Sequence, residues 1–319
     1  MEAKKTLRIN KSFLQKLVII GILAIIVIAL SILSKQFLTS ANIYNVSNQV
    51  ALIIITGAPV TLLMISGNFD LSIGGIVAMT GILFAKFATF GIPLFLCALM
   101  ACAVGAIIGY INGILVVNLK ITSFIATLGL MYVTRGLAYI ISDGKNINKG
   151  LPTTFSQLGR EFVGPVPLTL IIFIVVVVIF YFLESRTIFG KYSFAIGGNR
   201  VAAELSGIAI GKITLILFIL SGLFAAFSGV ILGSRLGVGQ PNVGVGFEFD
   251  VIIAVVLGGT SLSGGKGSVI GMVIGAFIVG FLANGLNLLG IQSFWQSVIK
   301  GIVLVGAVVL DRLIKEKIS

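Results

Sequence analysis

The sequence contains no histidine, and only 10% of its 319 residues are charged. A chain without histidine has no Ser-His-Asp triad and no histidine ligand for zinc or haem. Soluble domains contain about 25% charged residues. The low charged fraction therefore excludes a soluble enzyme, a nucleic-acid-binding module and a disordered protein. It also argues against an ATPase within this chain, because no long polar stretch is present to fold one.

Cysteine is nearly as scarce, with only Cys97 and Cys102 in one apolar run. Residues five positions apart point to different sides of a helix, so neither a disulfide nor a paired metal site is expected. We interpret both cysteines as packing residues and expect no bound metal.

What the chain has in abundance is apolar sequence: 58% of the residues are hydrophobic, mean hydropathy is +1.17, and 40 residues are glycine. Membrane-spanning helices need about 20 apolar residues and are rich in glycine. The pattern predicts an all-α polytopic membrane protein with about ten transmembrane helices. The eighth range is short and the third is rich in small residues, so either range could be broken or re-entrant. The expected ranges are Leu17–Leu33, Val50–Ser66, Leu71–Phe87, Leu94–Val117, Ser123–Ile141, Leu168–Leu183, Lys212–Leu232, Phe249–Gly259, Ser268–Leu289 and Phe294–Leu310.

The basic residues predict the orientation of these helices. With the N-terminus inside, 14 Lys and Arg residues fall on the inner side and 6 on the outer side, as the positive-inside rule requires. Both termini are thus expected to be cytoplasmic, in one transmembrane domain over 1–319. Residues 1–16 form a cytoplasmic tail, 142–167 an external loop and 184–211 a cytoplasmic loop. The net charge of +12 then reflects topology and implies no nucleic acid partner.

Three acidic residues, Asp70, Glu248 and Asp250, lie near the ends of apolar runs, and none lies convincingly at a helix centre. Ion-coupled transporters usually place ionisable groups at the membrane midplane, so the pattern argues against that class. Asp70 lies in a polar stretch, 66–74, that separates two apolar runs. Asp70 or a nearby serine could cap the next helix, or the stretch could be a hinge or gate.

The stretch 258–268 is rich in glycine and contains Lys266, which suggests a phosphate-binding loop. The required spacing fails, because Thr260 stands where the first glycine is needed and Gly267 follows the lysine. We interpret this stretch as a flexible cytoplasmic turn.

Small residues also recur every four positions and share a helix face, which favours close packing of helices within one subunit or across a subunit interface. These stripes are Gly105, Gly109 and Gly113; Gly267, Gly271 and Gly275; and Ala225, Gly229 and Gly233.

The cytoplasmic loop is the most informative segment. Asn199 is placed to cap a short helix that Gly207 would end. Val201, Leu205 and Ile208 would then share one apolar face. Such a helix either lies on the membrane surface or docks into a groove on a partner.

This loop resembles the Glu-Ala-Ala-x-x-x-Gly segment of ABC importer permeases, with Val201 at the position of the leading Glu. Its fuller pattern is similar to the ribose/galactose-type branch, as are 66–74 and the later stretches 255–260 and 264–268. The resemblance covers essentially the whole chain. It implies an ATPase-coupling loop that contains Gly198, Asn199, Ala202, Ala203, Glu204, Ser206, Gly207 and Ile208. Candidate gate or hinge residues are Asp70, Ser72, Gly74, Gly258, Gly259 and Thr260.

The resemblance also implies the partners. A separate ATPase subunit, tandem or paired, would use ATP and Mg²⁺, while this chain would bind no cofactor and catalyse no reaction. An extracytoplasmic solute-binding protein would deliver a monosaccharide such as ribose, galactose or xylose, docking near Lys145, Lys149 and Arg160. A second permease copy or paralogue would complete the pathway in the cell (inner) membrane, surrounded by lipid.

The solute itself cannot be read from the residues. Four asparagines could contact it, but no motif singles them out: Asn68, Asn112, Asn284 and Asn287. The alternatives are a related importer for a furanosyl autoinducer, a nucleoside or a branched-chain amino acid, or an ion-coupled secondary transporter.

Overall fold

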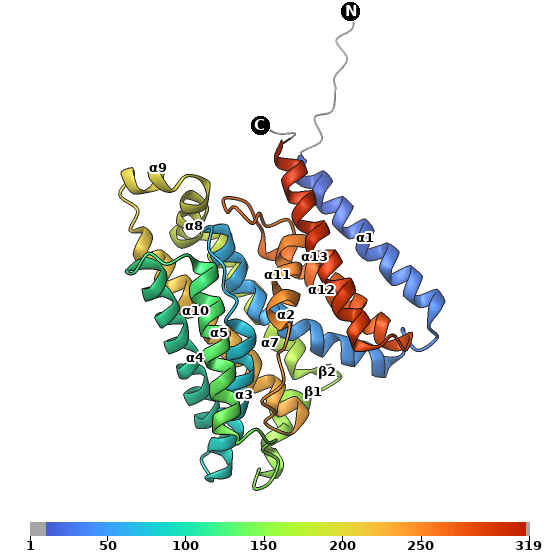
Figure 1. Cartoon of the computed structure of the whole chain (residues 1–319). Coiled ribbons are helices and arrows are strands. Elements are labelled where there is room, and N and C mark those ends of the chain that lie inside the picture. The colour runs from blue at the N-terminus through green and yellow to red at the C-terminus, as the bar shows by residue number, and fades with distance from the viewer. Residues whose placement is uncertain (1–10, 317–319) are drawn as a thin grey trace, which may run out of the picture.

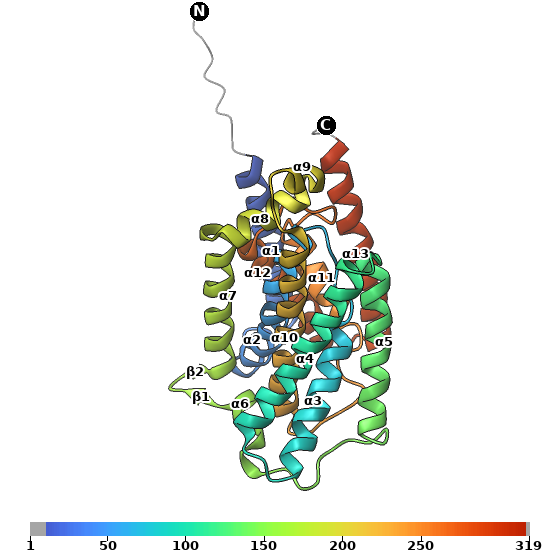
Figure 2. The ribbon, with the colours of Figure 1, turned by 90° about the vertical axis from the view of Figure 1, so that its left-hand side faces the viewer.

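The structure is a computed structural model that describes residues 11–316. The described residues form a helical bundle, with a two-stranded antiparallel hairpin as its only sheet (Figures 1 and 2). The helices are α1 Lys11–Leu33, α2 Ser40–Ile65, α3 Ile73–Thr89, α4 Leu94–Val117, α5 Ser123–Ile141, the 3-10 helix η1 Thr153–Ser156, α6 Gln157–Arg160, α7 Leu168–Arg186, α8 Ile188–Gly198, α9 Arg200–Leu205, α10 Ile210–Leu236, α11 Phe247–Leu257, α12 Val269–Leu288 and α13 Ser293–Glu316; the strands are β1 Phe162–Val163 and β2 Val166–Pro167.

The expectation of an all-α polytopic membrane protein is confirmed. Within the described chain, six helices are long and apolar enough to cross a membrane, namely α2, α4, α5, α7, α10 and α12. Each expected apolar range falls on a helix, because a backbone in lipid must satisfy its hydrogen bonds internally. Helix α1 is described from residue 11 onward, within the tail expected over 1–16, and residues 1–10 lie outside the described part.

Helix α2 is the centre of the bundle, buried along most of its length and packed against α7, α10, α11 and α12. It begins ten residues before the expected start of the second range. Polar residues hid this first part from a hydropathy pattern, and two of them have partners on other helices. Asn42 exchanges side-chain hydrogen bonds with Asn284 of α12, and Asn48 accepts one from Thr169 of α7.

Small residues let the helices pack closely within this chain, as one of the two alternatives predicted. A Cβ at Gly105 of α4 would overlap the backbone of Gly222 on α10. Gly229 of α10 lies equally close to α3, and Gly271 of α12 lies against the backbone of Gly258. These contacts join α10 to α4 and α3, and α12 to the end of α11.

The stretch between α2 and α3, residues 66–72, is non-helical backbone that packs against α5. The Phe69 N–H donates to Oγ of Ser123 at 3.1 Å, and the Leu71 N–H donates to Oγ1 of Thr127 at 3.0 Å. Non-helical backbone at membrane depth is tolerated only where the protein itself supplies such partners. The irregular backbone therefore precedes the third helix, and α3 itself is continuous.

Helix α3 begins well inside the bundle. Gly75, in its first turn, lies against Thr134, which is eleven residues along α5, or about 16 Å from its first residue. The stretch 237–246 then runs beside α3, and Gly244 contacts the carbonyl of Gly74. The short helix α11 starts there, so the N-termini of α3 and α11 meet inside the bundle. The expectation of a short eighth helix is confirmed.

The two long connections lie at opposite ends of the bundle. Helices α8 and α9 stand at the end where α1 begins and α13 finishes, while α6 and the hairpin lie toward the other end (Figure 2). The loop expected over 184–211 is mostly helical, because α7 continues to Arg186 and α8 fills 188–198. Sequence reasoning missed α8, whose polar and glycine residues resemble those of a loop.

Candidate functional site

Helix α9 has the ends that the sequence predicted. The Asn199 side chain accepts a hydrogen bond from the Ala202 N–H at 3.0 Å, which caps the helix. Gly207 ends it with a φ of +79°, a conformation that favours glycine. The Ser206 hydroxyl donates to the Ala202 carbonyl at 2.8 Å. Ser206 and Asn199 therefore hold the short helix at both ends.

The outer face of α9 has no cover within the described chain. Val201 is 67% exposed and Leu205 is 85% exposed. The prediction that Ile208 extends this face is wrong, because the helix ends at residue 205 and Ile208 packs with Ile196 and Ala203. Helix α9 thus rests on a small apolar cluster of its own and presents two apolar side chains outward.

Helix α8 joins this outer helix to the bundle through a glycine junction, which we define as Gly67, Gly197, Gly264 and Gly265. A Cβ at Gly197 would overlap the carbonyl oxygen of Ile65 at the end of α2. The Gly265 N–H donates to that same carbonyl at 2.8 Å. A Cβ at Gly264 would lie 2.9 Å from the Gly67 nitrogen. Three stretches that the sequence marked separately, 66–74, 198–208 and 258–268, therefore meet at this junction or adjoin it.

Asp70 lies three residues beyond the junction and is fully buried. Its Oδ1 accepts from the Ser72 N–H at 2.9 Å and the Ser72 hydroxyl at 2.6 Å, and its Oδ2 accepts from Ser221 of α10 at 2.6 Å. Asn112 of α4 donates to the Ser72 hydroxyl at 2.9 Å. The network fixes the non-helical stretch to α4 and α10, and we call these four residues the Asp70 network.

The helix-cap alternative for this stretch is wrong in detail. Ser72 stands at the N-cap of α3, but its side chain makes no capping bond and instead donates to Asp70. Sequence reasoning also did not single out Ser221, because an isolated serine in an apolar helix gives no signal of a partner 151 residues away.

The remaining gate candidates are dispersed. Gly258 packs against Gly271 of α12, and Gly259 has a φ of +89°. The Thr260 hydroxyl is buried and has no hydrogen-bond partner among the described residues. Gly74 lies away from this turn, in the first turn of α3, where a Cβ would overlap Oε2 of Glu248. The predicted candidates therefore belong to two places, the turn 258–260 and the start of α3.

The candidate docking residues lie in the connection between α5 and α7. Lys145 and Lys149 are exposed. The Arg160 guanidinium donates to the carbonyls of Arg235 at 2.7 Å and Leu236 at 3.1 Å. A cation at these last carbonyls stabilises the C-terminus of α10. Arg160 thus has a structural contact that the sequence did not reveal.

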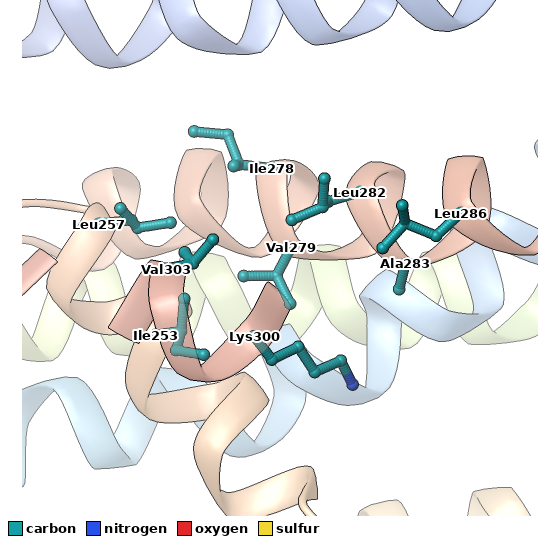
Figure 3. Close-up of a pocket in the computed structure, with 9 residues that line it drawn as sticks. All are labelled: Ile253, Leu257, Ile278, Val279, Leu282, Ala283, Leu286, Lys300 and Val303. Atoms are coloured by element: carbon teal, nitrogen blue, oxygen red, sulfur yellow. The ribbon is translucent and has the colours of Figure 1, made fainter. Parts of the chain in front are cut away.

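Figure 3 shows an apolar hollow between α11, α12 and α13, with Lys300 at its edge. Its volume is about 20 Å³, which suffices for one water molecule. Lys300 forms an ion pair with Asp250 at 2.8 Å. The hollow is too small for a solute of several carbon atoms, so Lys300 and Asp250 are structural partners of α11 and α13.

Comparisons with known proteins agree on one family. The profile described as "Branched-chain amino acid transport system / permease component" matches residues 42–308. The chain is 44% identical to "Ribose import permease protein RbsC" of Bacillus subtilis (strain 168), over 91% of this chain and 90% of that protein. It is 37% identical to "D-allose transport system permease protein AlsC" of Escherichia coli (strain K12), over 92% and 91%. It is 36% identical to "Galactose/methyl galactoside import permease protein MglC" of the same strain, over 95% and 97%. No solved structure matches the chain.

Proposed function

The chain belongs to the family of branched-chain amino acid transport system permease components, and on that premise we propose that it carries a monosaccharide such as ribose, galactose or xylose. It is a permease subunit of an ABC importer, a multi-pass protein of the inner membrane and not an enzyme. The proposal of a sugar rests on the names of the curated relatives, which include ribose, allose and galactose permeases.

An ABC importer permease works with an ATPase subunit and a solute-binding protein. We propose further that the ATPase is a tandem-domain protein and that two permease copies, or this chain and a paralogue, form the pathway. ATP and Mg²⁺ are used by the ATPase. We propose about ten crossings, and the positive-inside bias supports an orientation with α8, α9 and both termini on the cytoplasmic side.

The convergence at the glycine junction carries the proposal for coupling. The exposed face of α9 offers Val201 and Leu205 to a groove on the ATPase. When ATP binding closes the ATPase pair, α9 moves and α8 transmits the displacement through Gly197 to the end of α2. The non-helical stretch that holds Asp70 follows directly, so movement of the ATPase reaches the middle of the bundle.

Reconstitution tests the function. Proteoliposomes are prepared with the permease, its ATPase and its binding protein. They are expected to accumulate radiolabelled D-ribose, D-allose or D-galactose only when ATP is present on the side of the membrane that carries the ATPase. Unlabelled leucine and nucleosides are included as competitors, since they represent the alternative solutes. Uptake driven by an ion gradient without the ATPase would overturn the assignment to an ATP-driven importer.

The end of α9 gives a first prediction. Gly207→Arg is expected to reduce uptake at least tenfold while the protein remains in the membrane, because a bulky residue is strained at a φ of +79°. Gly207→Asn is the matched control and should retain most uptake, since asparagine tolerates this conformation. A charged residue at buried Ala203 should act like Gly207→Arg. Normal uptake by the arginine variant, with its ATPase still bound, would contradict the role of α9.

The external lysines give a second prediction. Lys145→Glu combined with Lys149→Glu is expected to weaken docking of the binding protein severalfold, because both side chains are exposed and would face carboxylates. The measurement is the binding-protein concentration that half-saturates ATPase activity, at low and high salt. An unchanged half-saturating concentration at low salt would remove both lysines from the docking surface.

A further inference from the structure

Glu248 is an acid that the coupling proposal does not use. It lies in the first turn of α11 and is only 4% exposed. Its carboxylate has hydrogen bonds with the backbone of Gly246 and of Glu248 itself, but Oε2 is buried with no hydrogen-bond partner among the described residues. Buried carboxylates are almost always paired or fully hydrogen-bonded, so this atom calls for an explanation.

Arg135 of α5 is the charge that faces the same region. Its Nη2 donates to the Gly244 carbonyl at 3.1 Å, while Nη1 is buried without a partner among the described residues. Arg135 is near enough to interact electrostatically with Glu248. Arg135 and Glu248 do not form an ion pair such as that of Lys300 with Asp250. Two buried groups of opposite charge thus interact electrostatically without a direct bond.

The backbone around the pair is built to let these groups approach. A Cβ at Gly74 would overlap Oε2 of Glu248 and would lie 2.8 Å from the Gly244 carbonyl. Gly244 and Gly246 have φ values of +69° and +80°, which favour glycine. Helices α3 and α11 both begin here, and the dipoles at their N-termini stabilise a negative charge. Interrupted helices that end at membrane depth form the binding sites of several transporters.

Residues close to the pair in sequence are exposed on both elements. Val245 and Phe249, which flank Glu248, are 72% and 44% exposed. Tyr132, one turn from Arg135 on α5, is 68% exposed. A solute in contact with these residues would meet an aromatic ring on each element.

We propose that Glu248 and Arg135 form a binding site for a hydroxyl group of the transported solute. A hydroxyl donates one hydrogen bond and accepts others, so it can donate to Oε2 of Glu248 and accept from Nη1 of Arg135. The same pair could hold the carboxylate of an amino acid at Arg135 and its ammonium group at Glu248, which makes leucine the informative competitor in the uptake test. The assignment of a hydroxyl group rests on the proposed import of a sugar.

The first test uses the complete importer and radiolabelled D-ribose, D-allose and D-galactose. Glu248→Gln and Arg135→Gln are each expected to lower uptake at least tenfold, while ATPase activity stimulated by the binding protein stays within twofold of wild type. Glu161→Gln, which neutralises an exposed acid of the outer connection, is the matched control and should retain uptake. Unchanged uptake would overturn the proposal, and so would an equal loss of uptake and ATPase activity, which indicates a structural role.

The second test does not depend on which sugar is carried. Val245→Cys, made with Cys97→Ala and Cys102→Ala, is expected to react with a charged, membrane-impermeant thiol reagent, because the proposal places it beside a water-filled pathway. Val178→Cys in the middle of α7 is the exposed apolar control and should stay unlabelled. Absence of labelling at Val245→Cys throughout the ATPase cycle would overturn the site. Failure of the wild-type importer to carry any of the three sugars would instead contradict the proposed function.

Discussion

Replacement of Gly197 by alanine is expected to reduce ATP-driven uptake at least a hundredfold, with the permease still inserted in the membrane. The new Cβ would overlap the Ile65 carbonyl and would lie 2.5 Å from the Gly265 nitrogen. Both are backbone atoms, which cannot turn away as a flexible side chain can. Helix α8 must therefore shift outward, and the 2.8 Å hydrogen bond from Gly265 to Ile65 must lengthen or break. The movement of α9 would then no longer reach α2.

The neighbouring glycine provides the matched control. A Cβ at Gly198 would meet nothing within 4 Å, so Gly198→Ala should keep at least half of the wild-type uptake. Uptake and ATPase activity are measured together in proteoliposomes, because a broken junction predicts ATP hydrolysis that is no longer coupled to transport. Equal losses in the two variants would instead assign the effect to the surface that contacts the ATPase, and would contradict the role of the junction.

The features predicted correctly from the sequence are those set by local chemistry. The apolar ranges became helices because the hydrophobic length and the internal hydrogen bonding of a helix are local properties. The ends of α9 were predicted from Asn199, whose side chain caps the helix, and from Gly207, which adopts a positive φ because it lacks a side chain. Both effects act within one turn. The failed phosphate-loop spacing also led to the correct description of 258–268 as a turn between helices.

The features that escaped prediction depend on contacts between distant parts of the chain. Asp70 was recognised as a polar residue between two apolar runs, but its partner Ser221 lies 151 residues away. Arg135 and Gly244 are 109 residues apart, so no spacing in the sequence brings them together. Glu248 looked like an acid at the end of a span, because the unwound stretch that carries α11 into the bundle cannot be inferred from hydropathy. Whether a charged side chain is buried depends on the fold and cannot be predicted from composition.

Replacement of Asp70 by alanine is expected to destabilise the permease by about 2–4 kcal/mol and to abolish uptake. The variant removes the acceptor of three hydrogen bonds, from the Ser72 N–H, the Ser72 hydroxyl and the Ser221 hydroxyl. Donors left unsatisfied in a buried site cost about 1–3 kcal/mol each, and serine hydroxyls recover part of this by turning to their own helix. The non-helical stretch would then lose its attachment to α10, directly beyond the glycine junction.

Two variants separate the carboxylate from the general cost of losing a buried polar group. Asp70→Asn keeps Oδ1 as an acceptor for Ser72 and can donate to Ser221. Its free energy of unfolding should therefore lie within about 1 kcal/mol of that of the wild type. Thr56→Val removes one neutral bond from α2 to Ser228, which can still donate to the Leu52 carbonyl, and should cost about 1 kcal/mol. Stability is measured by thermal unfolding in detergent, and uptake in proteoliposomes. If Asp70→Ala unfolds at the wild-type temperature, the Asp70 network does not hold the stretch in place. If Asp70→Asn loses uptake as completely as Asp70→Ala, a negative charge is required there, beyond the hydrogen bonds that position the backbone.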